Sequence, residues 1–434
     1  MSPAHRTSQH RWRVVALVVI VIAGVGVLAA TYGAATPQSL ATPASLVSSP
    51  DAESSAWYCA GQGTSANAAS GQILLTNTTG HAVTGNVTTV SDAGAAVRTA
   101  VAIPPHSVVS PTLQAPLSGS WVSDIVTLAG GGVAVTQAVQ GPSGWSIAPC
   151  QSATSAAWYF PGGTTSSGAG LAISLLNPTT TPVVVDLSFV TPSGVVHPLN
   201  YQGVVLQPGQ LVIKDVESEV QNDSTVSTVV AARTGRFVAA QLQLFPAPAA
   251  GLSLVTGFAR PESHWVIPQS QETQGGSSEI DVLNPGTTSE SVTVQLRLPS
   301  GPLAPQSGMA GGIDGLSTMS PTAQWVVAPP GTSTAKPVSG AAPQSLALTN
   351  TSGAPVDYRA DALSPTGERP LASGTLMAHA TVLVSGSALA AAGLNQIIVR
   401  ASGPMAVSED AGPSGAVGVV TIPGLPLGAR IGGS

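Results

Sequence analysis

Charged residues are scarce in this sequence. Asp, Glu, Lys and Arg make up only 8% of its 434 residues, about a third of their share in an average soluble protein. Lys214 and Lys336 are the only lysines, and the formal net charge is −6. Beyond the arginines near the N-terminus there is no basic cluster, so the chain lacks the electrostatic footprint of nucleic-acid binding. We therefore expect no nucleic-acid partner.

Cysteine is nearly absent as well. Cys59 and Cys150 are the only two; they do not form a C-x-x-C motif, and no pair of histidines at metal-ligand spacing accompanies them. This pattern predicts no metal centre and no other cofactor. In a chain that is exported, as the apolar N-terminal run described below indicates, an even number of cysteines indicates a disulfide. We predict that Cys59 pairs with Cys150.

Aromatic side chains are also few, at 4% of the chain, so Val, Ala, Leu and Ile must form the core. The chain is instead rich in glycine and proline, with 48 and 36 residues. Many short strands joined by Gly- and Pro-containing turns are typical of all-β proteins. Because the chain is long enough for three or four domains of ordinary size, we expect an all-β fold of several domains.

The N-terminus carries one long apolar run. Residues 14–30 contain no polar side chain, and the apolar character continues to Ala35. A helix needs roughly 17–25 such residues to cross a bilayer, and the arginines before the run place its N-terminal side in the cytoplasm. We predict a cytoplasmic tail at 1–13, a transmembrane signal anchor at 14–35 and a flexible tether at 36–54.

A cleaved signal peptide is the alternative for this run. Gly-Ala-Ala at 33–35 would be its cleavage site and the mature protein would be secreted, but the apolar region of a signal peptide is normally only about 7–15 residues. We therefore expect a single-pass protein of the cell membrane, with the C-terminal bulk of the chain extracytoplasmic.

Three stretches of the sequence begin in the same way: WYCAGQG at Trp57, WYFPGGT at Trp158 and WVIPQSQ at Trp265. Each is followed by an apolar segment that ends in asparagine, and a fourth such segment has no Trp start. These asparagines are Asn77, Asn177, Asn284 and Asn350. Self-similarity at a regular spacing indicates one supersecondary unit repeated along the chain.

Within each unit, apolar and polar residues alternate. Val183, Val185, Leu187 and Phe189 occupy every other position of one segment, which is typical of a strand with one buried face. We interpret the turns after each Asn, and the Gly-containing segment that closes each unit, as hairpin turns. About seven strands in roughly 100 residues favour an immunoglobulin-like β-sandwich over a propeller blade of about 40–50 residues.

The spacing of the asparagines predicts the module boundaries. The step from Asn284 to Asn350 is much shorter than the two steps before it, too short for the closing strands of the third unit. The irregular join at 302–343 is where we look first for a role beyond scaffolding. The predicted domains are β-sandwich 1 at 55–156, β-sandwich 2 at 157–263, a shortened β-module 3 at 264–342, β-module 4 at 343–427 and a tail at 428–434.

Few residues suggest catalysis. Ser333 and Lys336 have the S-x-x-K spacing of serine acyl-enzymes that process peptidoglycan, but the sequence contains neither K-T-G nor S-D-N. The acidic run at 215–223 lacks the loop glycine of an EF-hand, so we expect a solvated loop, with a weak Ca²⁺ site as the alternative. The scattered histidines form no acid–base pair. We predict that the protein is not an enzyme.

The tryptophans that start the repeats are the candidate ligand-stacking residues. Exposed rings at Trp57, Trp158 and Trp265 would stack on sugars, whereas buried rings would anchor each sandwich. Large aromatic residues at repeat-equivalent positions are more often core residues. We therefore expect a packing role, with glycan stacking as the alternative.

Four Asn-x-Ser/Thr sequons occur, at Asn77, Asn86, Asn222 and Asn350. Such sequons are glycosylated in a eukaryotic secretory pathway. The preference of this chain for Arg over Lys, with abundant Ala, Gly and Val, indicates a high-GC bacterial gene. We do not expect these sequons to be modified.

The repeat motifs resemble those of an uncharacterised family. WYFPGGT at 158–164, LLNP at 175–178 and VLNP at 282–285 carry the likeness, which extends over residues 55–300. The family comprises membrane-anchored extracytoplasmic proteins of high-GC Gram-positive bacteria with an actinobacterial domain of unknown function. It has no assigned activity, so the resemblance implies only location and architecture.

These observations together predict a non-enzymatic, membrane-anchored protein of the extracytoplasmic cell envelope. Its fold would be a single transmembrane helix followed by tandem immunoglobulin-like β-sandwich modules, with a structural or interaction role. The alternative is a protein that binds cell-wall carbohydrate. The expected partners are the membrane and either an envelope protein or a cell-wall glycan.

Overall fold

The computed structural model of the chain describes residues that all lie within one unit, Ala44–Ser434. The predicted cytoplasmic tail, the anchor at 14–35 and most of the tether lie outside the described residues. Within the described part, no helix is long and apolar enough to cross a membrane. The described residues are 48, 52–64, 70–111, 117–141, 144–245, 251–262, 265, 278–294, 297–298, 301–302, 306–310, 322–327, 345–350, 352–364, 367–378, 380–384, 397–403, 405–411 and 420–423.

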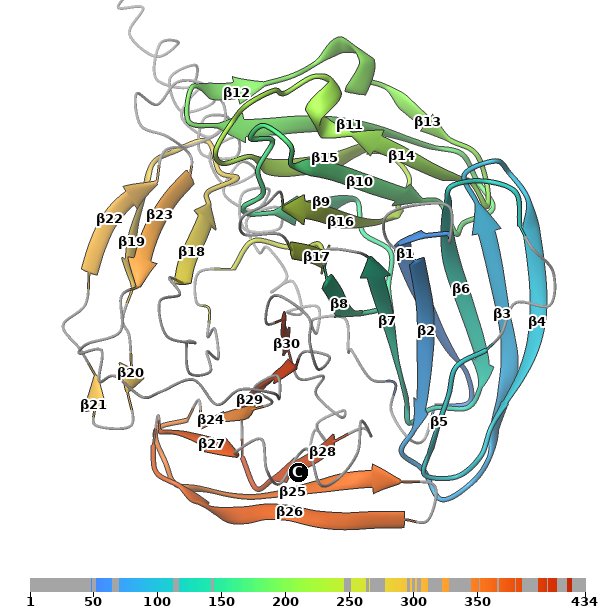
Figure 1. Cartoon of the computed structure of the whole chain (residues 1–434), viewed down its shortest axis with the longest axis vertical. Helices are drawn as coiled ribbons and strands as arrows, with labels where there is room; N and C mark the ends of the chain where they lie inside the picture. Colours follow the sequence, from blue (N-terminus) through green and yellow to red (C-terminus); the bar gives the residue numbers. More distant parts are fainter. Residues whose placement is uncertain are drawn as a thin grey trace, which may run out of the picture. The chain divides into compact units, whose positions relative to one another are not determined.

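The described chain is all-β, as predicted, and its strands form several sheets with two short 3-10 helices between them. Sandwich 1 contains β1 to β8, shown in blue and teal in Figure 1. Antiparallel pairing joins β4-β3-β6-β1 and β5-β2-β7-β8, and one parallel bridge between Gly63 and Ser70 connects the two groups. Apolar side chains of both groups meet in one core around Trp57. The strands are β1 (Ser55–Gly63), β2 (Ser70–Asn77), β3 (Val83–Ser91), β4 (Ala96–Ile103), β5 (Ser107–Val109), β6 (Trp121–Ala129), β7 (Val133–Gly141) and β8 (Gly144–Pro149).

The predicted disulfide is present in sandwich 1. Cys59 on β1 is bonded to Cys150, which follows β8 directly. Both residues are fully buried in the same core as Trp57. The bond therefore ties the first strand of sandwich 1 to its last, as the sequence predicted.

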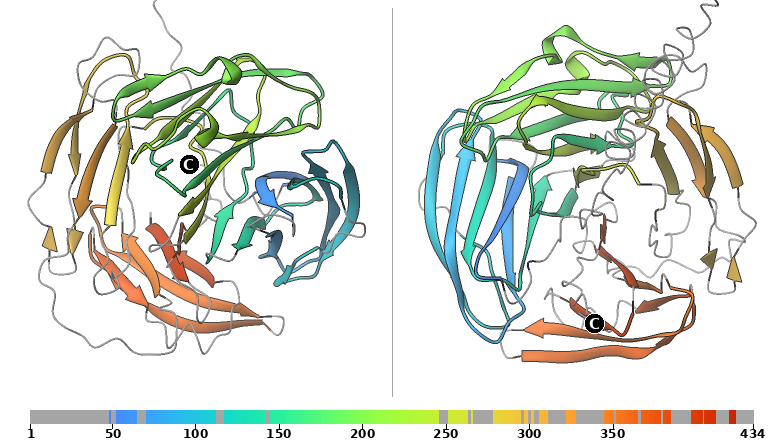
Figure 2. Two further views of the ribbon diagram at one scale, coloured as in Figure 1. Left: turned by 45° about the horizontal axis from the view of Figure 1, so that its top comes forward. Right: turned by 180° about the vertical axis from the view of Figure 1, so that it is seen from behind.

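Sandwich 2 contains β9 to β17 and packs two sheets face to face. The first sheet has the order β14-β10-β16-β17, and the second has the order β12-β11-β15-β9 with β13 also paired to β11. Figures 1 and 2 show these strands in green. The elements are β9 (Ala157–Phe160), β10 (Gly170–Leu176), β11 (Val183–Thr191), β12 (Gly194–Val196), η1 (Leu199–Tyr201), β13 (Val204–Leu206), β14 (Leu211–Asp215), η2 (Val216–Ser218), β15 (Ser227–Thr234), β16 (Val238–Phe245) and β17 (Gly251–Thr256).

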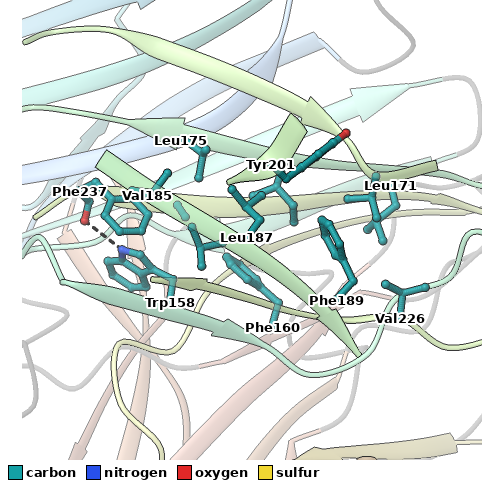
Figure 3. Close-up of a cluster of buried hydrophobic side chains, with 14 of the residues drawn as sticks. Trp158, Phe160, Leu171, Leu175, Val185, Leu187, Phe189, Tyr201, Val226 and Phe237 are labelled. Carbon is teal, nitrogen blue, oxygen red and sulfur yellow. Dashed lines mark hydrogen bonds between the residues drawn. The ribbon is translucent and has the colours of Figure 1, made fainter. Parts of the chain in front are cut away.

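The core of sandwich 2 lies between these sheets. Val183, Val185, Leu187 and Phe189 on β11 are all fully buried in it, so the predicted alternation is confirmed. Figure 3 shows Leu187 and Phe189 packed among aromatic and aliphatic side chains of neighbouring strands. A strand whose alternate residues are all apolar can bury one whole face in this way.

The turns after the repeated asparagines are not hairpin turns. β10 and β11, which flank the turn after Asn177, belong to different sheets, so the chain crosses the sandwich there. Gly235 likewise lies between β15 and β16, which also belong to different sheets. The hairpin prediction was wrong at both places, because a short Asn/Pro/Gly turn serves a change of sheet as well as a reversal within one.

A buried asparagine amide stabilises the crossing between β10 and β11. The Nδ2 of Asn177 donates to the carbonyl oxygens of Thr181 (2.8 Å) and Leu206 (3.0 Å). Its Oδ1 accepts hydrogen bonds from the backbone N–H (3.0 Å) and the hydroxyl (2.7 Å) of Thr179. Because a chain that leaves a sheet loses its ladder partners, buried backbone groups there need a substitute. The amide of Asn177 provides one for both sides of the turn.

Module 3 contains three separate strand pairs, β18-β23, β19-β22 and β20-β21. Module 4 contains two sheets, β27-β24-β29-β30 and β26-β25-β28, around a small core that includes Leu348 and Ala360. The strands of module 3 are β18 (Ser278–Leu283), β19 (Glu290–Val294), β20 (Arg297–Leu298), β21 (Gly301–Pro302), β22 (Gln306–Ala310) and β23 (Thr322–Val327). Those of module 4 are β24 (Ser345–Asn350), β25 (Val356–Ser364), β26 (Gly367–Leu376), β27 (Thr381–Val384), β28 (Ile397–Ala401), β29 (Met405–Ala411) and β30 (Val420–Pro423).

Sandwiches 1 and 2 share a second apolar core. Ala60, Val90 and Val139 of sandwich 1 form one buried cluster with residues of sandwich 2 that include Ala240 and Leu254. The N–H of Leu254 also donates to the hydroxyl of Ser146 on β8 (2.9 Å). β16 is consequently buried on both faces, which distinguishes these modules from independent domains on a flexible string.

The same position of the repeat makes the contact to the next module twice. Gly61, four residues after Trp57, has a φ of +93° and approaches Ser174 so closely that a Cβ would lie 2.8 Å from its Oγ. Gly162, four residues after Trp158, approaches Asp281 on β18 in the same way. Ser174 and Asp281 each precede their repeated asparagine by three residues. The glycine of the repeat motif is therefore a contact point between successive modules.

Candidate functional site

Two of the three candidate stacking residues lie inside the protein. Trp57 on β1 is 0% exposed and Trp158 on β9 is 1% exposed. The Nε1 of Trp158 donates to the carbonyl oxygen of Phe237 (2.9 Å), as Figure 3 shows. Neither ring has a face open to a ligand, so the stacking alternative is wrong for these two residues. They anchor the cores of sandwiches 1 and 2, which was the expected role.

Trp265 differs from its two repeat equivalents because it is exposed. Its exposed fraction is 52%, and its ring packs edge-on against Phe258, which is 40% exposed, with a centroid separation of 4.8 Å. The Nε1 of Trp265 donates to the carbonyl oxygen of Glu262 (2.9 Å). The stacking hypothesis thus retains one of its three residues and gains Phe258 as a neighbour.

The backbone beneath this aromatic pair is held in place by β9. The N–H of Phe258 donates to the carbonyl oxygen of Tyr159 (3.0 Å), and the N–H of Tyr159 donates back to Phe258 (2.9 Å). The side chain of Gln151 also donates to the carbonyl oxygen of Gly257 (3.2 Å). Because Phe258 and Tyr159 are directly opposite each other in this bridge, their side chains lie on the same face.

Tyr159, Phe258 and Trp265 therefore form an aromatic surface, in which Phe258 and Trp265 are exposed and Tyr159 is half-buried. Partial burial raises the pKa of Tyr159 above its ordinary value of 10. The phenol is protonated at neutral pH with or without this shift, and it can donate a hydrogen bond. Aromatic rings with a polar end are suited to contacts with sugars and with protein partners. Phe258 was missed in the sequence because it belongs to no repeat motif.

A second feature that the sequence did not predict is a carboxyl group inside sandwich 1. Asp124 on β6 is buried, and it accepts hydrogen bonds from the hydroxyl of Thr89 and from the Nε2 of Gln62 (2.9 Å). Burial raises the pKa of Asp124 to about 6, against the opposing effect of the two hydrogen bonds. The alternation on β6 places Asp124 on the same face as the core residue Val126. An alternating pattern predicts an apolar residue at this position, not a carboxylate.

The acidic run at 215–223 is used by the fold itself. Glu217 accepts the N–H of Leu171 at the start of β10 (3.0 Å), and Glu219 accepts the side-chain amide of Asn200 (2.9 Å). In the described part of the chain, no three His, Cys, Asp or Glu side chains are grouped so that they could hold a metal ion. Ser333 and Lys336 lie outside the described residues.

Comparison with known proteins identifies one domain. Residues 127–320 match a family of unknown function, DUF5719. The matched range starts within β6, includes all of sandwich 2 and the Phe258–Trp265 pair, and ends after β22. No curated protein and no solved structure matches the chain. The chain thus contains a DUF5719 domain, whose core is the sandwich that carries the aromatic surface.

Proposed function

We propose that this chain is a non-enzymatic, membrane-anchored protein of the extracytoplasmic envelope of a high-GC Gram-positive bacterium. Immunoglobulin-like β-sandwich modules would hold an interaction surface away from the bilayer. The observation that carries the proposal is the apolar core shared by sandwiches 1 and 2, because it makes a stiff support rather than a flexible string. The buried disulfide supports an oxidising location, and the apolar run at 14–35 supports an anchor.

Location and anchoring can be tested together in cells that express the full chain with a C-terminal tag. We expect the chain to stay with the membranes after an alkaline wash and to lose its tag when intact cells are treated with protease. Cys59 and Cys150 should react with an alkylating reagent only after reduction. A tag protected from protease, together with reactive thiols in unreduced cells, would contradict the proposal.

Binding of cell-wall glycan is a second candidate function, and the exposed Phe258–Trp265 pair favours it. If the pair stacks on sugar rings, Trp265→Ala should weaken binding of wall polysaccharide at least tenfold, which is about 1.4 kcal/mol. Phe245→Ala is the matched control, since Phe245 is a similarly exposed aromatic residue on β16. Titration followed by tryptophan emission and by pull-down measures the effect. Equal binding by the two variants would exclude this site.

A further inference from the structure

One edge of sandwich 2 contains residues that the matching edges of sandwich 1 and module 4 lack. β12 and β13 both pair with β11 at this edge, and residues 197–203 lie between them (Figure 1). Phe189 and Val185 are four residues apart on β11, whereas their partners Val196 and Val204 are eight residues apart. In sandwich 1 the edge strand β4 pairs with β3 in one unbroken register, and in module 4 the register of β26 on β25 shifts once. A sandwich of this kind therefore forms its edge without the loop at 197–203.

The 197–203 loop presents a leucine to solvent. Leu199 is the first residue of η1 and is 88% exposed, more than any other large hydrophobic side chain that the structure describes. A single exposed leucine is ordinary on a protein surface, so its exposure alone indicates no function. The way in which the fold holds the loop, and the charge around it, distinguish Leu199 from such a residue.

Hydrogen bonds from the loop to the rest of sandwich 2 fix its shape. Tyr201 is buried in the core, and its hydroxyl donates to the carbonyl oxygen of Asp215 (2.6 Å). The side-chain amide of Gln202 donates to the carbonyl oxygen of Leu187 (2.7 Å). Because little conformational freedom is lost when a loop that is already ordered docks, such a loop is suited to binding. Leu199 is thus presented on a preorganised support.

Acidic side chains lie beside the loop. The carboxylate of Glu219 accepts a hydrogen bond from the side-chain amide of Asn200 (2.9 Å). Asp215 and Glu217 belong to the same short segment as Glu219, which consists of η2 and its two flanking residues. Asp215 and Glu219 are exposed, and Glu217 is partly buried. Three of the few carboxylates in this chain are therefore gathered at the base of the loop.

Two basic side chains also reach the loop, but they do not balance these carboxylates. Arg233 forms a salt bridge with Asp186 (2.7 Å), so this pair carries no net charge. The Nζ of Lys214 donates to the carbonyl oxygen of Asn200 (3.3 Å) and lies over the ring of Tyr201. One ammonium group stands against three carboxylates, so the surface around the loop is negatively charged.

We propose that the 197–203 loop docks into a basic partner protein, which receives Leu199 in an apolar pocket and faces Asp215 and Glu219 with Lys or Arg side chains. Complementary charge across an interface favours such a partner and disfavours others. A membrane surface does not fit, because anionic lipid headgroups repel the same carboxylates. A second copy of this chain fits less well, because its formal net charge is −6. The inference goes beyond the proposed function, because it depends neither on the anchor nor on glycan binding by the aromatic surface.

A random library of short peptides displayed on phage tests the apolar contact. The library is first depleted on Leu199→Ser and then selected on the purified native chain. We expect enrichment of peptides that combine an apolar residue with Lys or Arg, and roughly tenfold weaker binding of these peptides to Leu199→Ser. Met377→Ser is the matched control, since Met377 is also strongly exposed and lies outside sandwich 2; it should bind like the native chain. No enrichment, or enrichment of peptides without basic residues, would overturn the proposal.

Both variants should keep the urea midpoint of the native chain, because substitutions of exposed side chains rarely change stability. A loss of binding by Leu199→Ser would then report the contact and not the fold. A lower midpoint for Leu199→Ser than for Met377→Ser would overturn the proposal, since it would show that the leucine serves the fold.

A second experiment tests the charge of the surface with the selected peptides. The double variant Asp215→Asn, Glu219→Gln should bind them roughly tenfold more weakly at low salt, and the difference should shrink as salt is added. Glu290→Gln on β19 is the control, because Glu290 is an exposed carboxylate of another module. Equal binding by the double variant and the control would overturn the proposal.

The other two occupants are tested with the same leucine variant. Vesicles of phosphatidylglycerol that bind the native chain more tightly than Leu199→Ser would overturn the choice of partner in favour of a membrane surface. A dimer of the native chain that Leu199→Ser dissociates, measured by sedimentation, would overturn it in favour of a second copy.

Discussion

At the scale of single residues, the same buried amide recurs in all four repeats. It lies at the turn that connects the strand ending at the repeated asparagine to the next strand. The Nδ2 of each asparagine donates to the carbonyl oxygen four residues later, and the Oδ1 accepts the N–H two residues later. This holds at Asn77, Asn177, Asn284 and Asn350. At Asn77 and Asn350 the residue two positions later is Thr or Ser, which is why both positions match a sequon. A glycan on either buried amide is incompatible with this fold.

Asn177→Ala should be strongly destabilising for this reason. The variant leaves the carbonyl oxygens of Thr181 and Leu206 without their buried donor, and each unsatisfied group costs about 1–3 kcal/mol. We expect the free energy of unfolding to fall by about 2–4 kcal/mol, measured in urea, with the largest loss of exchange protection in β10 and β11. Asn200→Ala is the control, because Asn200 is exposed and exposed substitutions usually cost within about 0.5 kcal/mol. Equal effects would show that the amide is not a stabilising centre.

Asp124 makes the stability of sandwich 1 depend on pH. Its pKa in the folded state is about 6, above the ordinary value of 3.8, so the folded state binds the proton more tightly than the unfolded state. This contribution is complete below pH 3.8 and is lost as the pH rises through 6. A difference of this size corresponds to about 3 kcal/mol. Asp124→Asn should therefore unfold at higher urea than the native chain at pH 7.5 but not at pH 4. If the difference in stability between the native chain and the variant were the same at pH 7.5 as at pH 4, the assignment would be contradicted.

At the scale of secondary-structure elements, the sequence was informative where one face of a strand is buried. The alternation on β11 identified four core residues, because period-2 patterning reflects the geometry of a strand directly. The turns were assigned to hairpins because turn residues report a local bend and not which sheet the next strand joins. β16 carries Gln241 and Gln243 on its inner face, where both are buried, and their amides bind the carbonyl oxygens of Gly162 and of Thr164. No local pattern predicts that pairing.

The contact made by Gly61 can be measured against a matched glycine. Gly61 and Gly94 have similar φ values, +93° and +83°, but a Cβ at Gly94 would meet nothing within 4 Å. Both Gly→Ala variants suffer the same backbone strain of about 1–2 kcal/mol. Gly61→Ala should cost about 1–3 kcal/mol more, since overpacking against Ser174 adds to the strain. The difference in urea midpoint between the two variants isolates the contact, and equal midpoints would show that Ser174 yields without cost.

At the scale of the whole molecule, the sequence located the disulfide but not the core that sandwiches 1 and 2 share. Residues of that second core, such as Ala60, Ala240 and Leu242, lie on the outer faces of their own sandwiches. Within one module these positions look like ordinary surface with small apolar residues. Their burial depends on the placement of a neighbouring module, which the spacing of apolar residues within one strand does not reveal.

The shared core makes the disulfide relevant beyond sandwich 1. Replacing Cys59 and Cys150 by Ala removes a cross-link over 91 residues, which in the chain-entropy model lowers stability by about 4–5 kcal/mol. If sandwiches 1 and 2 unfold as one unit, exchange protection should fall in β10 and β16 as well as in β1 and β7. Protection in β25 of module 4 serves as the internal reference. Loss confined to sandwich 1 would show that the two sandwiches unfold independently, because a shared core that is stable only when both halves are folded must transmit the loss from one to the other.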